Sequence, residues 1–195
     1  MNKNVVYRVA IIGDFGVGKT SILNRLINNS YSTAIESTIG PSDFRFQINK
    51  DGVLYKIQFT DMPGDIKFSS AMPLLFRNCS FAIAVFDLTN QATLDNLNDW
   101  VDKFRSNCNE KHEILVVGNK LDNKQILSDS IIQPAVEKMD INYLSNYISV
   151  SAKSGENFSE LLQLIGNVIE IISKPYAIEI KKISEDKTNS CCNIL

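Results

Sequence analysis

The chain has a single histidine, His112, and only four cysteines among its 195 residues. A zinc site or a histidine-based catalytic triad needs clustered histidine, cysteine or acidic residues, so the sequence argues against both. Four cysteines are also too few for a disulfide scaffold, and the isolated Cys79 and Cys108 are interpreted as small buried hydrophobes. Cys191 and Cys192 are adjacent and close to the C-terminus, so burial in a hydrophobic core does not explain their presence.

The sequence also lacks a surplus of charge of one sign and a long hydrophobic run. Lysine and arginine number 20, aspartate and glutamate 22, and the formal net charge of −2 provides no overall field to hold nucleic acid. No apolar stretch reaches the roughly 18 residues of a membrane-spanning helix, and we expect no secretory signal at the N-terminus. With 44% hydrophobic residues, the composition is typical of one soluble globular domain.

Patterns typical of strands and helices alternate along the chain. Apolar or alternating runs predict strands at residues 5–12, 43–48, 54–59, 81–86, 114–117 and 147–150. Asp51-Gly52 is a hairpin signal, so the second and third strands should pair antiparallel. Helical spacing appears at 22–27, 94–108 and 158–172, whereas Pro134 predicts an interruption of any helix that begins at Ser130. The alternation predicts an α/β fold with a mostly parallel sheet and ligands at the carboxyl ends of its strands.

Residues 13–20, GDFGVGKT, match the phosphate-loop pattern GxxxxGK[ST] between a predicted strand and a predicted helix. Glycines let backbone N–H groups face phosphate oxygens, and the helix N-terminus adds partial positive charge. Lys19 is expected to reach the β- and γ-phosphates, and Thr20 to offer its hydroxyl to Mg²⁺. The motif predicts a nucleoside triphosphate ligand but leaves the base open.

Two further motifs follow later strands and point to guanine. In residues 119–122, NKLD, the Asp122 carboxylate can accept hydrogen bonds from guanine N1–H and the 2-amino group. Adenine lacks that pair of donors and would leave the carboxylate unpaired. The stem of Lys120 can pack over the base, and a backbone N–H within residues 151–153, SAK, can meet guanine O6.

Together with Thr38-Ile39-Gly40 and Asp61-Met62-Pro63-Gly64, these motifs resemble those of Ras-superfamily small GTPases, and most of all the Rab subfamily. The stretches STIG at 37–40 and FRNC at 76–79 and the cysteine-rich C-terminus carry the Rab resemblance. It implies the P-loop NTPase fold of small G proteins, with a six-stranded, mostly parallel sheet, one antiparallel strand and about five helices. It also implies a GTPase domain over residues 1–174 and a flexible tail over 175–195.

The family's nucleotide and metal contacts carry over by matching positions. Thr20, Thr38 and, through a water, Asp61 would hold Mg²⁺, and Gly64 would donate its N–H to the γ-phosphate. The resemblance places GTP or GDP against a larger set of residues: Phe15, Gly16, Val17, Gly18, Lys19, Thr20, Ser21, Tyr31, Thr38, Asp61, Gly64, Asn119, Lys120, Asp122, Ser151, Ala152 and Lys153. The alternative for Tyr31, in place of a contact with the guanine edge, is a plain surface tyrosine.

The sequence departs from the family at its catalytic centre. Asp65 stands where the family has the glutamine that orients the attacking water, so catalysis would rest on Lys19, Gly64 and this aspartate. Two unit charges about 4 Å apart repel by roughly 4 kcal/mol at an effective dielectric of 20, which disfavours a carboxylate beside the phosphates. Phe15 occupies a position where the family has a small residue, and it would crowd an arginine finger. Slow hydrolysis is therefore expected.

The C-terminal residues suggest lipid attachment. The last four residues, CNIL, fit the C-a-a-X prenylation pattern loosely, and Cys191 supplies a second thiol beside Cys192. One lipid chain binds a membrane only marginally whereas two bind stably, and residues 181–195 carry a net charge of only +1 from three lysines, one glutamate and one aspartate. The alternative is a pair of unmodified thiols.

These features favour a Rab-like GTP/GDP switch in vesicle traffic, on the cytoplasmic face of intracellular membranes and cycling with the cytosol. The resemblance implies an exchange factor, a GAP, a GDP-dissociation inhibitor, a prenylation escort protein and effectors as partners, and no nucleic acid. One alternative is a GTP-binding module with little hydrolysis. Another is a non-Rab Ras-like GTPase, because Thr60 replaces a tryptophan usual in Rab proteins. A phosphate-loop kinase is disfavoured by the NKLD motif and by the lack of a spare segment for a lid.

Overall fold

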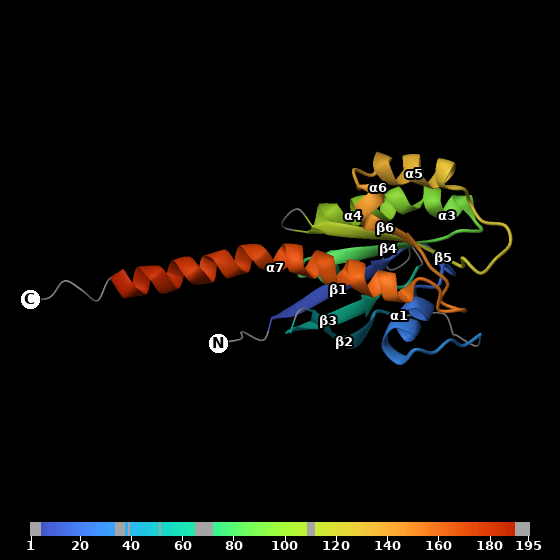
Figure 1. The fold of residues 1–195 in the computed structure, drawn as a ribbon. Coiled ribbons are helices and arrows are strands. Elements are labelled where there is room, and N and C mark those ends of the chain that lie inside the picture. Colours follow the sequence, from blue (N-terminus) through green and yellow to red (C-terminus); the bar gives the residue numbers. More distant parts are fainter. Residues whose placement is uncertain are drawn as a thin grey trace, which may run out of the picture.

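The computed structural model describes residues 5–33, 38, 40–50, 52–64, 72–108 and 112–189. A six-stranded sheet in the order β2-β3-β1-β4-β5-β6 forms its centre (Figure 1). Its strands are β1 (Val6–Ile12), β2 (Ser42–Lys50), β3 (Val53–Asp61), β4 (Phe81–Asp87), β5 (Glu113–Asn119) and β6 (Tyr147–Ser149). Strand β2 pairs antiparallel with β3, and the other pairs are parallel. The predicted α/β class and sheet are confirmed.

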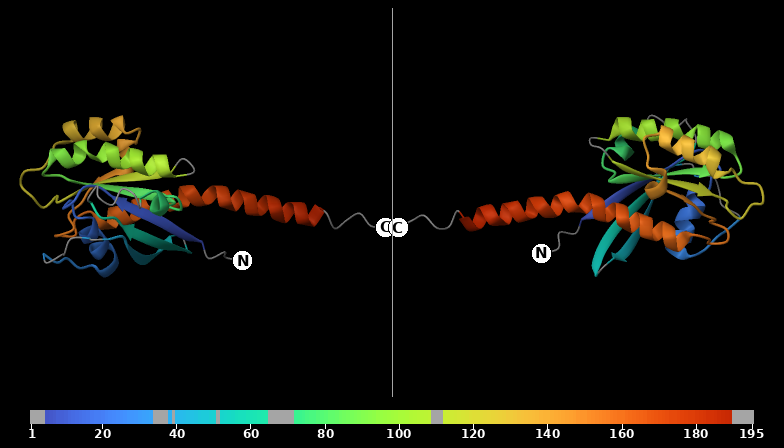
Figure 2. Two further views of the ribbon diagram at one scale, coloured as in Figure 1. Left: turned by 180° about the vertical axis from the view of Figure 1, so that it is seen from behind. Right: turned by 45° about the horizontal axis from the view of Figure 1, so that its top comes forward.

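Helices cover both faces of the sheet. The described helices are α1 (Lys19–Asn28), α2 (Met72–Phe76), α3 (Gln91–Asp95), α4 (Leu97–Asn107), α5 (Asp129–Lys138), α6 (Tyr143–Asn146) and α7 (Phe158–Asn189). Helices α1 and α7 lie on one face, while α3, α4 and α5 lie on the other (Figures 1 and 2). No described helix is long and apolar enough to cross a membrane.

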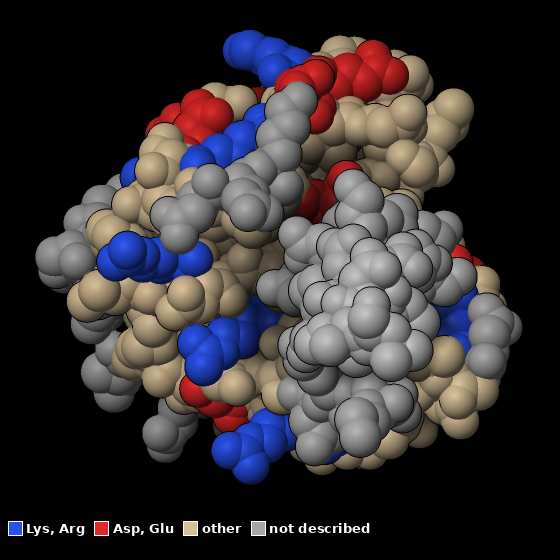
Figure 3. Space-filling model, turned by 90° about the vertical axis from the view of Figure 1, so that its left-hand side faces the viewer, with Lys and Arg blue, Asp and Glu red and all other residues tan. Residues whose placement is uncertain are grey.

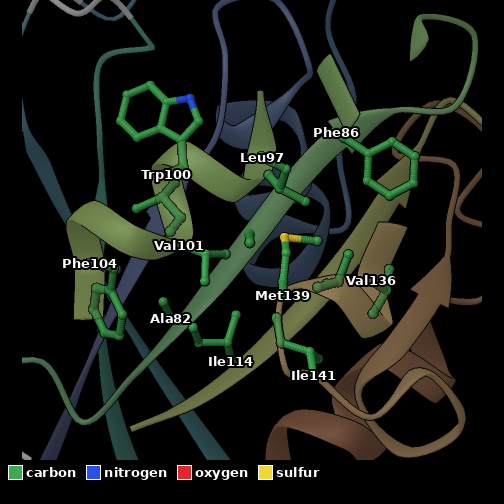
Figure 4. Close-up of a cluster of buried hydrophobic side chains, with 14 of the residues drawn as sticks. Ala82, Phe86, Leu97, Trp100, Val101, Phe104, Ile114, Val136, Met139 and Ile141 are labelled. Carbon is green, nitrogen blue, oxygen red and sulfur yellow. The ribbon is translucent and has the colours of Figure 1, made fainter. Parts of the chain in front are cut away.

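Two hydrophobic clusters hold these layers together, because alternate residues of the buried strands point to opposite faces. In β4, Ala82, Ala84 and Phe86 pack toward α4 and α5, whereas Phe81, Ile83 and Val85 pack toward α1 and α7. Figure 4 shows the first cluster, with Trp100 at one end and Ile141 at the other. All seven residues of β4 are buried, which explains its near-continuous apolar sequence.

The hairpin of β2 and β3 follows the predicted pattern. Its register runs without interruption from Ser42 opposite Asp61 to Lys50 opposite Val53. Gly52 lies in the turn with φ of 79°, a left-handed conformation that glycine adopts without strain. Thr60 lies opposite Asp43 and donates a hydrogen bond to its carboxylate at 2.7 Å.

The helical regions differ from the sequence predictions in several places. The single helix expected over 94–108 is divided into α3 and α4 at Asn96. The predicted interruption at Pro134 is wrong, because α5 continues through that residue. Proline removes only one backbone hydrogen bond there, and the neighbouring Ile132 and Val136 are buried in the core, so packing outweighs the loss.

Helix α7 continues to Asn189, well past the predicted domain end at residue 174. In all three views it extends beyond the sheet and away from the other elements (Figures 1 and 2). Residues 175–189 therefore continue the last helix of the domain. The division into a domain over 1–174 and a tail over 175–195 stays a prediction.

Candidate functional site: a nucleotide cleft at the strand ends

The phosphate loop joins β1 to α1 at the carboxyl edge of the sheet. Gly18 precedes α1 with φ of 95°, and a Cβ built there would lie 2.3 Å from Asn119 Nδ2. Only glycine permits this conformation and this close approach. Asn119 then donates to the Val17 carbonyl at 2.9 Å, so the loop is fastened directly to the end of β5.

Lys19 is the one cationic side chain in residues 13–20, and it is buried, at 6% exposure. Its Nζ donates to the carbonyl oxygens of Gly13 at 2.9 Å and Asp14 at 2.8 Å. Burial lowers the pKa of Lys19 to about 8, although Asp61 and Asp14 oppose the shift. A bound polyphosphate would supply the strong negative partner that this ammonium otherwise lacks.

We therefore expect affinity for GDP to fall as the pH rises through about 8, because Lys19 then loses its charge in the empty site. Binding must restore that proton, so the loss should approach ten-fold per pH unit above the pKa. Titration of GDP between about pH 7 and pH 9 measures this dependence. The variant Lys19→Arg, whose guanidinium keeps its charge, should show a flatter profile, and a flat profile in the unmodified protein would contradict the assignment.

Three oxygen-bearing side chains from separate segments meet beside Lys19. The Thr20 hydroxyl donates to Asp61 Oδ2 at 2.5 Å and lies 3.0 Å from the Thr38 hydroxyl. Thr38 in turn donates to Asp61 Oδ2 at 3.4 Å. Asp61 is 1% exposed, burial raises its pKa, and its Oδ1 is buried without a hydrogen-bond partner among the described residues.

An unpartnered buried carboxylate oxygen beside two hydroxyls fits a hard divalent cation, since Mg²⁺ prefers oxygen ligands and retains several waters. The predicted residues Thr20, Thr38 and Asp61 are therefore together, and they are compatible with Mg²⁺. A cation there would provide the partner that Asp61 Oδ1 lacks and would favour its ionised form.

Substitution Thr20→Asn should weaken Mg²⁺-dependent retention of nucleotide by about ten- to hundred-fold, because an amide cannot replace the hydroxyl within the same space. The measurement is the release rate of a fluorescent GDP analogue with and without Mg²⁺. The matched variant Thr20→Ser keeps the hydroxyl and should release nucleotide like the unmodified protein. Equal Mg²⁺ dependence in Thr20→Asn would mean that the loop register is wrong.

The NKLD and SAK segments lie together at the ends of β5 and β6. Asn119 accepts a hydrogen bond from the Ala152 N–H at 3.1 Å while it donates to the phosphate loop. Ser151 donates to Asp122 Oδ1 at 2.7 Å, and Lys153 pairs with Oδ2 at 3.4 Å. The Ser151 hydrogen bond is the main cause that lowers the pKa of Asp122, so this carboxylate is an ionised acceptor. The Ala152 N–H is already engaged by Asn119.

A cavity of about 320 Å³ joins the phosphate loop to these segments. Its lining contains Gly16, Gly18, Ser21, Tyr31, Ser32, Thr33, Asn119, Lys120, Asp122, Asn123, Ala152 and Lys153. Lys120 reaches along this wall to Asp87, with its Nζ 2.6 Å from Oδ2. Tyr31 lines the cavity and remains partly exposed. Of the predicted base-side residues, this lining contains all but Ser151, which is buried and contacts Asp122 from behind the wall.

Gly64 and Phe15 meet at the other side of the phosphate loop. A Cβ built on Gly64 would lie 2.4 Å from the Phe15 nitrogen, so only glycine fits there. The Phe15 side chain points outward and is 67% exposed. Asp65, Cys191 and Cys192 lie outside the described residues.

Several residues of the site were not predicted from the sequence. Ser32, Thr33 and Asn123 line the cavity, and two further residues support it from outside the predicted motifs. Arg25 of α1 donates to the carbonyls of Ala152 at 2.9 Å and Lys153 at 2.8 Å, and it thereby supports the SAK segment. Asp87 at the end of β4 holds Lys120. Both act over long sequence separations. An arginine within a helical pattern gives no local signal of its partner. Asp87, in contrast, lies at the carboxyl end of a predicted strand, where ligands bind in this fold class, so its position could have indicated a role in the site.

Comparison with known proteins agrees with this geometry. The model of the Ras family matches residues 8–171. The GTP-binding protein YPT53 of Saccharomyces cerevisiae is 29% identical over 166 residues, covering 83% of this chain and 76% of that protein. The Ras-related protein Rab-5B of Plasmodium falciparum is 31% identical over 163 residues, covering 83% and 77%. The Ras-related protein Rab7 of Pisum sativum is 28% identical over 204 residues, covering 97% of each chain.

The family match includes the phosphate loop, the Thr20–Thr38–Asp61 cluster and both base-side segments. The relatives that carry Rab names span most of the chain at about 30% identity. The protein belongs to the Ras family of small GTPases and is Rab-like.

Proposed function

We propose that this protein is a Mg²⁺-dependent GTP/GDP switch of the Rab type, with slow intrinsic hydrolysis, that acts in vesicle traffic on the cytoplasmic face of intracellular membranes. The observation that carries the proposal is that Asp122 and the phosphate loop line the same cavity. Asn119, from the same segment as Asp122, also donates a hydrogen bond to the Val17 carbonyl of that loop. The Asp122 carboxylate and the phosphate-loop residues Gly16 and Gly18 line one cavity, as binding of a guanine nucleotide by its base and its phosphates requires.

At the base end, Asp122 would accept hydrogen bonds from guanine N1–H and the 2-amino group. Ser151 and Lys153 already hold its two oxygens, which fixes the carboxylate at the cavity wall. The stem of Lys120, whose Nζ is held by Asp87, would lie along the base plane. Adenine would leave the carboxylate without matching donors, which is the basis for discrimination.

At the phosphate end, Lys19 and the backbone N–H groups of residues 16–20 would hold the β- and γ-phosphates. Bound Mg²⁺ would neutralise part of the phosphate charge. The Thr38 hydroxyl lies 3.0 Å from that of Thr20, and Gly64 packs on the loop at Phe15. These contacts support the proposal that both segments respond to the presence of a γ-phosphate, as switch segments do.

A GTP-binding module that scarcely hydrolyses its nucleotide is the second candidate. The exposed Phe15 favours it, because this ring stands at the outer face of the loop where an arginine finger would enter. Asp65 at the glutamine position favours it as well. The two candidates share nucleotide and metal, and they differ in the rate at which GTP is lost.

Membrane attachment is proposed to depend on Cys191 and Cys192. Figure 3 views the end of the domain from which α7 leaves, and its described residues show basic and acidic side chains interspersed. Residues 181–195 carry a net charge of only +1, from three lysines, one glutamate and one aspartate. This charge is too small to replace prenyl chains, each buried CH₂ of which contributes about 0.8 kcal/mol.

Cell fractionation of the double variant Cys191→Ser, Cys192→Ser tests this attachment. We expect the protein to move from the membrane fraction to the soluble fraction, because no lipid chain remains. The variant Cys79→Ser, altered within the domain, is the control and should stay with membranes. Undiminished association of the double variant would place the attachment elsewhere in the chain.

A further inference from the structure

The side chain of Asp14 turns away from the nucleotide cavity and toward the corner between α3 and α4. Its Oδ1 accepts a hydrogen bond from Trp100 Nε1 at 2.7 Å, and its Oδ2 accepts one from Asn96 Nδ2 at 2.8 Å. Both carboxylate oxygens are thus used by residues more than eighty positions away in the chain. Such charge-assisted hydrogen bonds are stronger than neutral ones.

The backbone of Asp14 contacts two residues of the expected phosphate site, Lys19 and Gly64. The Asp14 carbonyl accepts a hydrogen bond from Lys19 Nζ, and a Cβ built on Gly64 would lie 2.6 Å from the Asp14 carbonyl carbon. A shift of the Asp14 backbone would therefore displace Lys19 and the surface against which Gly64 packs.

Trp100 is a fixed donor. It is 2% exposed and packs in the cluster with Val101 and Leu97, at the end of that cluster in Figure 4. Lys103 lies over its ring, with Nζ 5.3 Å from the centroid. A buried indole N–H needs a partner, and here that partner is Asp14. The buried face of α4 is in this way connected to the phosphate loop.

We propose that Asp14 is a positioning residue through which Trp100 and Asn96 fix the phosphate loop, so that α4 sets how tightly the protein holds the phosphate end of its nucleotide. The inference rests on the proposed nucleotide-binding function. It assigns no contact between Asp14 and the ligand, and it leaves recognition of the base to Asp122 at the other end of the cavity.

The first test is the affinity of Trp100→Phe for GDP and GTP with Mg²⁺. Phenylalanine keeps most of the packing but removes the donor, and loss of one charge-assisted hydrogen bond corresponds to about ten-fold weaker binding. The preference for GTP over ATP should stay unchanged, because the base end is not altered. Asp14→Asn, which lies on the loop and spares the core, should show the same loss.

The second test uses the fact that Trp100 is the only tryptophan in the chain, so a ¹H–¹⁵N spectrum contains one indole N–H signal. In the unmodified protein this signal should shift when GDP and Mg²⁺ are added. In Asp14→Asn the signal of the free protein should move toward that of a more weakly hydrogen-bonded indole, and its response to GDP should shrink. A purely structural role for Trp100 would not produce that response to nucleotide.

Asn98→Ala is the matched control, because Asn98 lies in α4 and its side chain donates to Asp102 of the same helix at 3.1 Å. The control should bind nucleotide like the unmodified protein. Unchanged GDP affinity in both Trp100→Phe and Asp14→Asn, or an equal loss in Asn98→Ala, would overturn the inference while the proposed function stands. Failure of the unmodified protein to bind any guanine nucleotide would overturn both.

Discussion

Single-turnover GTP hydrolysis by this protein is expected to be slower than hydrolysis by its Asp65→Gln variant. A glutamine side chain can orient the attacking water and donate an N–H toward the γ-phosphate. An aspartate side chain has no N–H and would add negative charge if it faced a polyphosphate. Gly64, the preceding residue, packs on the phosphate loop, so position 65 follows directly after the loop contact. The measurement is phosphate release from preloaded protein after addition of Mg²⁺.

The response to a GAP should be the larger effect. An arginine finger contributes a factor of about 10³–10⁵. We expect the Phe15 ring, which is 67% exposed, to obstruct the space that such a finger would enter. We expect poor stimulation of the unmodified protein and of Asp65→Gln alone. The double variant Phe15→Gly, Asp65→Gln should regain a response to a GAP that relies on the glutamine of its GTPase.

Two controls make the comparison decisive. Cell extract should be included, because a GAP that supplies its own glutamine would bypass Asp65. The response of the single variant Phe15→Gly to a GAP distinguishes obstruction of the arginine finger by Phe15 from the absence of a glutamine at position 65. Intrinsic hydrolysis as fast in the unmodified protein as in Asp65→Gln would contradict the account, since Asp65 would then already perform the role of the glutamine.

Substitution Asp122→Asn should transfer the preference of the protein from guanine to xanthine nucleotides. An asparagine offers one acceptor and one donor, and xanthine carries an oxygen where guanine has its 2-amino group. Sites built around such polar pairs reject the wrong partner by about 10⁴–10⁵-fold, so a loss of GTP affinity of several orders of magnitude is expected. Competition between GTP and xanthosine triphosphate for a labelled nucleotide measures the change.

The reciprocal experiment is the control for folding. Xanthosine triphosphate should bind poorly to the unmodified protein and well to Asp122→Asn, so gain with one ligand accompanies loss with the other. Retention of GTP affinity by the variant would show that Asp122 does not read the base.

Local patterns were sufficient for the parts of the molecule that depend on local chemistry. The phosphate loop between β1 and α1, the turn at Gly52 and the buried strands follow from glycine placement and hydrophobic periodicity. The base-side motifs were found because each lies at or just after the end of a predicted strand. Parallel strands bring such segments to one edge of the sheet.

What the sequence did not predict depends on long-range contacts or on packing. Arg25 reaches the SAK segment and Trp100 reaches Asp14, and neither pair leaves a periodic signal. The continuation of α5 through Pro134 reflects core packing that outweighs local propensity. The division at Asn96 separates α3 from α4 within a stretch whose apolar spacing is continuous.

The most direct test of the account is calorimetric titration of the nucleotide-free protein with GTP and with ATP in the presence of Mg²⁺. Asp122 and the phosphate loop predict tight binding of GTP and binding of ATP weaker by about 10³-fold or more, because adenine leaves the carboxylate unpaired. Equal affinity for the two nucleotides, or a preference for ATP, would contradict the central claim that this cavity is built for guanine.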